Sequence, residues 1–202
     1  CLIKHSIDRV FCVPGESYLA ALDAFYDFRK KIKLINAKHE ATASNMAEAY
    51  GKLTGKPGVA FVTRGPGACH ASIGVHIAKQ DSTPMVLFVG QVATKMYGKG
   101  SFQEIDYVSM FSKVAKKSFQ ISKVESIEKL IHKAFQISNS GRKGPVVIAL
   151  PEDILVKTTM QKNLSAFDIK KAVVNKDQIL KIKSLLELSK KPLIILGGTN
   201  WS

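Results

Sequence analysis

The sequence predicts an α/β fold, in which a doubly wound, mostly parallel sheet carries helices on both faces. Three observations predict it. Short apolar, β-branched runs alternate with amphipathic runs of helical length between residues 10 and 150. The connections between these runs are short and contain Gly or Pro. Two runs, at residues 85–89 and 145–150, are apolar throughout, which is typical of strands buried inside a parallel sheet.

Each expected element has its own pattern. The strands are short apolar or β-branched runs, at residues 10–13, 32–36, 59–63, 85–89, 115–119 (an outer strand) and 145–150. The helices repeat apolar or small residues at three- and four-residue spacing, at residues 17–28, 40–53, 68–79 and 126–138. Pro14-Gly15 and residues 65–67 supply tight turns from strand to helix, and Gly55 ends a helix.

We interpret residues 1–156 as one domain. Weak periodicity over residues 157–175 predicts a linker. Residues 176–202 are expected to be the truncated start of a second α/β domain, with a helix at 178–188 and a strand at 193–196. We expect a piece of a longer protein, because the chain begins without Met and stops shortly after the last expected strand.

Composition narrows the class of protein. No run approaches the ~20 apolar residues of a membrane span, and no signal-peptide pattern is present, so we expect a cytoplasmic protein that contacts no membrane. The 30 Lys and Arg outnumber the 16 Asp and Glu, for a net charge of +14. The basic residues are mostly Lys, spread over several expected helices and loops without interleaved aromatic residues. A solvated lysine-rich surface is therefore favoured over nucleic-acid binding.

The cysteines and histidines show no metal-ligand spacing, and we expect no metal ligand in this chain. Cys1, Cys12 and Cys69 are interpreted as small buried side chains in a reducing compartment. Four histidines are interpreted as structural: His5, His70, His76 and His132.

In open α/β sheets, ligands bind beyond the carboxyl ends of the strands. That rule selects four segments: residues 14–16, 38–40, 64–67 and 90–91. Taken alone, each has two interpretations. Glu40 is either an acid stabilised at a helix start or a catalytic group. The glycines of residues 64–67 either present N–H groups to an anion or form a tight turn, and they match neither a Walker loop nor a Rossmann fingerprint.

The order and spacing of eight segments together are more specific. In chain order the segments are Val10-Phe11-Cys12-Val13-Pro14-Gly15, Lys38-His39-Glu40, Met46-Ala47-Glu48-Ala49-Tyr50, Gly65-Pro66-Gly67-Ala68, Asp81-Ser82-Thr83-Pro84, Gly90-Gln91-Val92, Phe102-Gln103-Glu104 and Gly144-Pro145-Val146. Together they resemble the N-terminal, pyrimidine-binding domain of the acetolactate synthase-like thiamine-diphosphate enzymes. The resemblance covers about residues 8–155, and residues 176–202 resemble the opening of that family's central domain.

The resemblance implies a catalytic role for Glu40. Its carboxyl group hydrogen-bonds the pyrimidine ring of thiamine diphosphate and favours the imino form, which takes the thiazolium C2 proton. The activated cofactor then attacks a 2-keto acid, and carbon dioxide leaves. The implied cofactor-binding residues are Pro14, Gly15, Glu40, Gly65, Pro66, Gly67 and Gly90. Phe102 and Gln103 are implied on the substrate side, although Gln103 is also compatible with a solvent-facing loop amide.

The resemblance also implies parts that lie outside this chain. In the family, Mg²⁺ holds the diphosphate at a Gly-Asp-Gly motif of a C-terminal domain, and a second subunit of a homo-oligomer completes the site. This chain alone is then an inactive half-site, and FAD binding stays open because the central domain is cut. A non-catalytic binding or assembly module is the alternative.

Three departures from the family pattern indicate a divergent branch. Glu16 stands where the synthases have a second glycine, and its side chain is expected to narrow the pocket or contact substrate. Arg64 replaces a small residue, and Cys69-His70 replaces the usual Thr-Asn.

Overall fold

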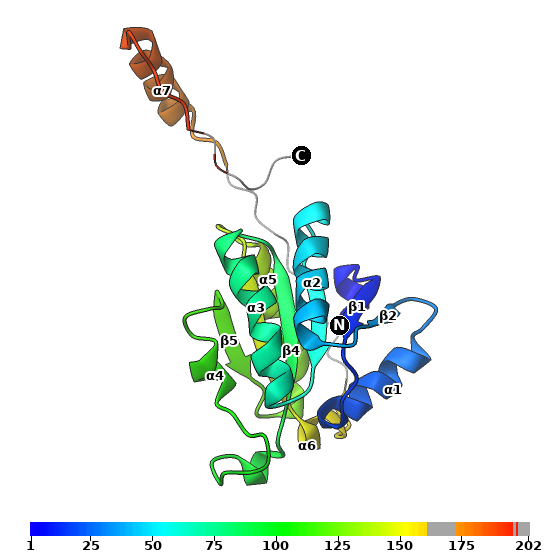
Figure 1. The fold of residues 1–202 in the computed structure, drawn as a ribbon. Helices are drawn as coiled ribbons and strands as arrows, with labels where there is room; N and C mark the ends of the chain where they lie inside the picture. Colours follow the sequence, from blue (N-terminus) through cyan, green and yellow to red (C-terminus); the bar gives the residue numbers. More distant parts are fainter. Residues whose placement is uncertain (161–172, 196, 198–202) are drawn as a thin grey trace.

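The computed structural model describes residues 1–160, 173–195 and 197, and within them six parallel strands form one sheet (Figure 1). The strand order is β2-β1-β3-β4-β6-β5. The strands are β1 (Arg9–Cys12), β2 (Lys33–Asn36), β3 (Gly58–Val62), β4 (Met85–Gln91), β5 (Lys117–Gln120) and β6 (Pro145–Pro151). The six strands expected within residues 1–156 are therefore confirmed, and the sheet is entirely parallel.

The helices of the described residues fall between and after these strands. The α-helices are α1 (Leu19–Asp27), α2 (Glu40–Thr54), α3 (Pro66–Gln80), α4 (Tyr107–Met110), α5 (Ile127–Asn139), α6 (Glu152–Leu155) and α7 (Lys176–Leu188). The 3-10 turns are η1 (Ile3–His5), η2 (Glu16–Tyr18), η3 (Thr94–Met96) and η4 (Val124–Ser126). None of these helices is long and apolar enough to cross a bilayer.

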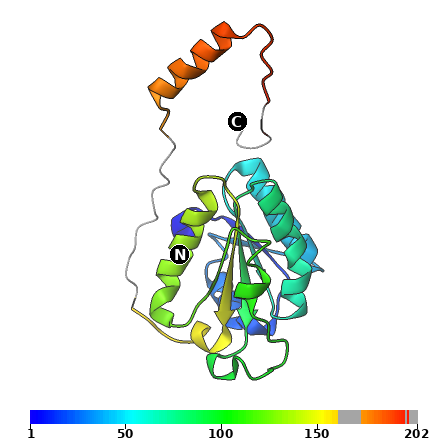
Figure 2. The same cartoon turned by 90° about the vertical axis from the view of Figure 1, so that its left-hand side faces the viewer.

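The sheet is covered on both faces, as predicted. Helices α1 and α5 pack on one face, around Phe61, Phe88 and Ile148. Helices α2 and α3 pack on the other, against Val62 and Leu87. Figure 2 shows α5 and the α2–α3 pair on opposite sides of the sheet. The connection from β1 through α1 to β2 crosses the sheet in the opposite direction to the connections through α2 and α3, which lead from β2 to β3 and from β3 to β4. Because such connections are right-handed, α1 must cover the other face of the sheet from α2 and α3.

The strands expected to be buried lie in the centre of the sheet. β4 and β6 pair in register from Met85↔Pro145 to Gln91↔Pro151, and every residue of both strands is buried. β5 is an edge strand, which confirms the outer position predicted for residues 115–119. The apolar sequences of β4 and β6 thus reflect a core on each face.

Other local predictions need correction. The helix expected at 17–28 is divided into η2 and α1, and the short helices α4 and α6 were not predicted. The strand expected at 193–196 is wrong over residues 193–195, which form no regular element, while residue 196 lies outside the described residues. These residues are exposed, and a strand requires a neighbour to satisfy its backbone. Most of the linker expected at 157–175 also lies outside the described residues.

Candidate active site

The predicted site residues gather at the carboxyl ends of neighbouring strands. Gly15 follows β1, Gly65 follows β3, and Gly90 is close to the end of β4. Because β1, β3 and β4 are parallel neighbours, these ends share one edge of the sheet. β2, which Glu40 follows, is the parallel neighbour of β1. We call this edge, with the loops directly after β1, β2, β3 and β4, the carboxyl rim.

Glu40 is the first residue of α2, and its position is set by the residue before it. His39 has extended backbone geometry and caps the helix, because its Nδ1 accepts a hydrogen bond from the Ala41 N–H at 3.2 Å. The Glu40 side chain is 14% exposed and points its Oε2 at Nδ1 of His70, 3.0 Å away. A carboxylate at this position is stabilised by the positive end of the helix dipole.

Gly67 lies beside the Glu40 carboxyl group. A Cβ atom at Gly67 would lie 3.5 Å from Oε1 of Glu40 and 2.9 Å from Cγ2 of Thr63. A side chain at this position would crowd Thr63 and would stand in van der Waals contact with Glu40. A carboxyl group at a helix start, beside a glycine, fits a flat ring that donates or accepts one hydrogen bond. The pyrimidine of thiamine diphosphate is such a ring.

Gly65 and Gln103 lie against each other on the rim. Gly65 has φ +63°, in the left-handed region that favours glycine, and a Cβ atom there would lie 2.6 Å from the Cβ atom of Gln103. Gln103 itself has φ +62°, a positive value that is uncommon for a residue with a side chain and that Ser6 and Ser82 elsewhere in the chain also have. The Gly65 N–H donates to the hydroxyl of Tyr107 at 2.7 Å. Tyr107 is fully buried, and this burial raises its pKa to about 12.

Gly15 and Gly90 are glycines for reasons of packing. A Cβ atom at Gly15 would lie 2.5 Å from Cβ of Thr63, and one at Gly90 would overlap Oγ of Ser17. Ser17 in turn hydrogen-bonds the Thr63 hydroxyl at 2.8 Å and accepts the Arg64 N–H at 3.2 Å. These two glycines allow η2 to pack tightly on the sheet, so their identity is explained without a ligand.

The remaining predicted residues are more peripheral. Pro14 and Pro66 are exposed, and Pro66 is the first residue of α3, where its fixed φ suits the helix start. Phe102 is 75% exposed, one residue before Gln103. The structure therefore brings Glu40 to Gly67, and Gly65 to Gln103, but leaves Phe102 in solvent.

Two of the departures from the family pattern contact each other. The buried Arg64 guanidinium donates to Glu16 at 2.7 Å and to Glu152 at 3.0 Å. The Glu16 side chain is mostly exposed, so the expectation that it narrows a pocket finds no support in its position. Instead, Glu16 supplies a negative charge to Arg64. A buried guanidinium without such a partner would destabilise the fold.

Sequence reasoning missed His70, because it treated this histidine as structural. The His70 ring stacks on the His39 ring, with centroids 4.4 Å apart, and its Nδ1 faces Glu40. The available signal was topological: α2 and α3 both start at the carboxyl rim on the same face. Spacing along the sequence cannot show this contact, because the two residues lie 30 positions apart.

The prediction for the cysteines is confirmed for one residue and wrong for two. Cys12 is buried in β1, and its burial raises the pKa of the thiol to about 11. Cys1 and Cys69 are exposed. Cys69 lies on the outward side of α3, next to His70.

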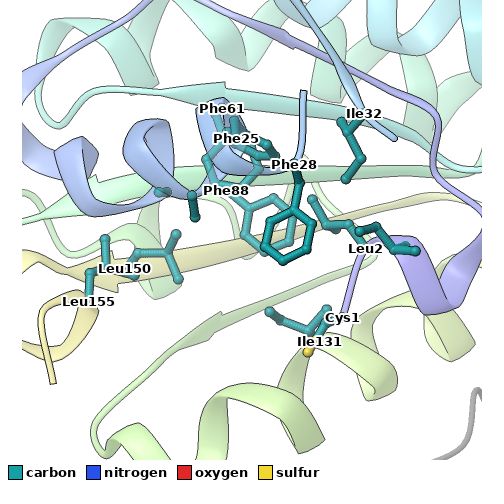
Figure 3. A pocket seen from close by; sticks show the side chains of 13 residues that line it. Cys1, Leu2, Phe25, Phe28, Ile32, Phe61, Phe88, Ile131, Leu150 and Leu155 are labelled. Atoms are coloured by element: carbon teal, nitrogen blue, oxygen red, sulfur yellow. The ribbon is translucent and has the colours of Figure 1, made fainter. Parts of the chain in front are cut away.

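An apolar cavity of about 280 Å³ lies away from these residues, on the α1–α5 face (Figure 3). It is lined by side chains such as Phe25, Phe28 and Ile131, and by none of the predicted site residues. Apart from Cys1 its lining is apolar, so we place the candidate site at the rim.

Comparison with known proteins identifies the family of this chain. The family described as "Thiamine pyrophosphate enzyme, N-terminal TPP binding domain" matches residues 1–110. The chain belongs to this family. Its fold is the thiamine pyrophosphate-binding α/β domain.

The relatives of this thiamine pyrophosphate-binding domain include acetolactate synthases. The chain is 38% identical over 203 residues to the acetolactate synthase large subunit of Buchnera aphidicola subsp. Schizaphis graminum, covering 98% of this chain and 35% of that protein. It is 36% identical to the isozyme 3 large subunit of Escherichia coli, with the same two coverages. It is also 36% identical to the mitochondrial catalytic subunit of Saccharomyces cerevisiae, over 96% of this chain and 30% of that protein. The chain thus spans about a third of the length of these relatives.

Proposed function

We propose that this chain supplies the pyrimidine-binding half of the active site of an acetolactate synthase-like enzyme, which decarboxylates or ligates 2-keto acids. The observation that carries the proposal is Glu40. Its carboxyl group is largely shielded, stands at the start of α2 and lies beside Gly67, where a Cβ atom would be 3.5 Å from Oε1. Membership in the thiamine pyrophosphate enzymes and similarity to acetolactate synthases support the assignment.

The proposed role of Glu40 follows from proton chemistry. When bound, thiamine diphosphate supplies a carbon nucleophile and an acceptor for the electrons released on decarboxylation. Glu40 shares a proton with a ring nitrogen of the pyrimidine. The start of α2, which His39 caps, positions the carboxyl group.

The other rim residues have supporting roles in this proposal. Gly65 and Gly67 line the ring, while Pro14, Gly15, Pro66 and Gly90 shape the backbone around it. Gln103, held against Gly65, donates a hydrogen bond to a substrate oxygen, and Phe102 covers the substrate side.

Further groups of the proposed enzyme lie outside the described residues. Another domain binds Mg²⁺ and the diphosphate, and a second subunit of a homo-oligomer completes the site. The exposed face of α2 and α3 carries Leu53, Ile73 and Ile77, which supports a subunit contact there. We place the enzyme in the cytoplasm, where the unpaired thiols of Cys1, Cys12 and Cys69 stay reduced.

The test is Glu40→Gln in the full-length enzyme, assayed with pyruvate, thiamine diphosphate and Mg²⁺. The amide keeps the shape of the side chain but cannot exchange a proton, so we expect kcat to fall by about 10²–10⁴-fold. The matched control is Glu125→Gln, an exposed acid of η4, which should retain wild-type activity. Circular dichroism checks that both variants fold. Wild-type turnover in a folded Glu40→Gln enzyme would overturn the role of Glu40, whereas no turnover in the folded wild-type protein would favour a non-catalytic module.

A further inference from the structure

Three side chains with metal-binding atoms meet beside the rim: His39, Glu40 and His70. Each offers one ligand atom, and these atoms lie within 4.8 Å of one another. They come from two helix starts, α2 and α3, which pack together on one face of the sheet. The contact is specific: the two imidazole rings stack, and Glu40 reaches His70 at 3.0 Å.

The chemistry of this set selects a class of metal. Two imidazole nitrogens and one carboxylate oxygen are the ligands of zinc sites that keep a fourth position open for water. The same set suits copper and nickel, whereas Mg²⁺ and Ca²⁺ prefer oxygen ligands alone. Zinc ligands bind at about 2.0–2.2 Å, so the three atoms must move closer than they are now. His70 is 48% exposed and has room to rotate.

One interaction opposes metal binding. Nδ1 of His39 uses its lone pair to accept the Ala41 N–H. A metal on Nδ1 would take this lone pair, and a metal on Nε2 would leave the single ring proton on Nδ1. Metal binding at either nitrogen of His39 therefore breaks the helix cap. Loss of such a cap changes an equilibrium constant by about five-fold, so it lowers the affinity for the metal without abolishing binding.

We propose that His39, Glu40 and His70 form a binding site for a divalent transition-metal ion of the zinc class. Because Glu40 is shared, the metal and the cofactor exclude each other, and zinc inhibits the enzyme by competing with thiamine diphosphate. This second step rests on the function proposed above, but metal binding itself does not.

The first experiment measures binding without activity. Zn²⁺ is titrated into chelator-treated, cofactor-free full-length protein by calorimetry, and Co²⁺ is added to a parallel sample to record its visible absorption. We expect a site in the wild type that weakens at least ~10-fold in His70→Asn, whatever a second group of metal-binding atoms at Cys1, Glu128 and His132 contributes to both proteins. His76→Asn is the matched control, because it removes an exposed histidine from the same helix and should bind as the wild type does.

A second variant separates the histidine from its neighbour. Cys69→Ser removes the exposed thiol next to His70 and should leave the site intact. Equal zinc affinity in the wild type and His70→Asn would overturn the proposed site. So would loss of the site in Cys69→Ser with retention in His70→Asn.

The competition is tested by inhibition. Zinc should inhibit the wild type less after incubation with thiamine diphosphate and Mg²⁺, and His70→Asn should need at least ~10-fold more zinc for the same fractional inhibition. Zinc binding that thiamine diphosphate does not displace would overturn the exclusion. A failed Glu40→Gln test would instead overturn the role of Glu40 in the proposed function and leave the calorimetric result standing.

Discussion

At the scale of single residues, the rim depends on buried polar contacts that support the turn after β3. The Gly65 N–H has its acceptor in the buried hydroxyl of Tyr107. Tyr107→Phe removes this acceptor while keeping the ring, and leaves a buried donor unsatisfied. We expect a loss of about 1–3 kcal/mol in the free energy of unfolding, measured by urea denaturation.

The control for this variant is Tyr26→Phe, which removes a hydroxyl from an exposed ring of α1. Its effect should stay within about 0.5 kcal/mol. Equal stability of the two variants would show that the Tyr107 hydroxyl does not support the Gly65 turn.

At the scale of elements, the start of α2 reaches the start of α3 because small residues let the two helices approach closely. A Cβ atom at Gly74 would lie 2.5 Å from Oγ and 2.6 Å from the carbonyl carbon of Ser44. Gly74→Ala gains about 1 kcal/mol of helix propensity. Overpacking against the α2 backbone costs about 1–3 kcal/mol, so we expect net destabilisation, seen as a lower Tm.

Ser72→Ala is the comparison for Gly74→Ala, since it adds helix propensity on the same helix without crowding α2. It should change stability by less than about 0.5 kcal/mol. If Gly74→Ala were as stable as Ser72→Ala, close packing would not be what sets the distance between the helices.

At the scale of the whole molecule, the chain start is fastened to α5 through a histidine pair. Nε2 of His5 lies 2.7 Å from Nδ1 of His132, across 127 positions, and the His5 ring stacks on Phe135. Burial, followed by the charge of His132, lowers the pKa of His5 from 6.5 to about 4. Between pH 6.5 and 4 the unfolded chain binds a proton at His5 that the folded chain does not. The contribution of His5 to the free energy of unfolding is therefore highest above pH 6.5 and decreases as the pH falls toward 4.

We expect His5→Phe to reduce this pH dependence. His5 is only partly buried, so its share of the loss between pH 7 and 4.5 is on the order of 2 kcal/mol. Urea denaturation at both pH values measures it, with the exposed His76→Asn as the control that keeps the wild-type difference. An unchanged pH dependence in His5→Phe would assign the loss to other groups.

Local sequence patterns predicted most of the fold. The strands of residues 1–156 are confirmed because a buried parallel strand needs an apolar run with turns at its ends, and both signals lie within a few residues. The start of α2 at Glu40 and the turn at Gly65 were predictable for the same reason. The short helices α4 and α6 were not, because four residues carry no periodicity. Residues 193–195 do not form the expected strand, because an apolar run becomes a β-strand only when a neighbouring strand pairs with its backbone.

The sequence by itself determined the order of strands and helices, and placed Glu40 and the glycine turns at the carboxyl ends of the strands. The tertiary structure alone decided which of these groups meet. It brought His70 to Glu40, paired Arg64 with Glu16, and turned Gly15 and Gly90 into packing positions. The physical reason is that these contacts join segments 30 or more residues apart. They depend on which face each helix covers and how closely the helices approach.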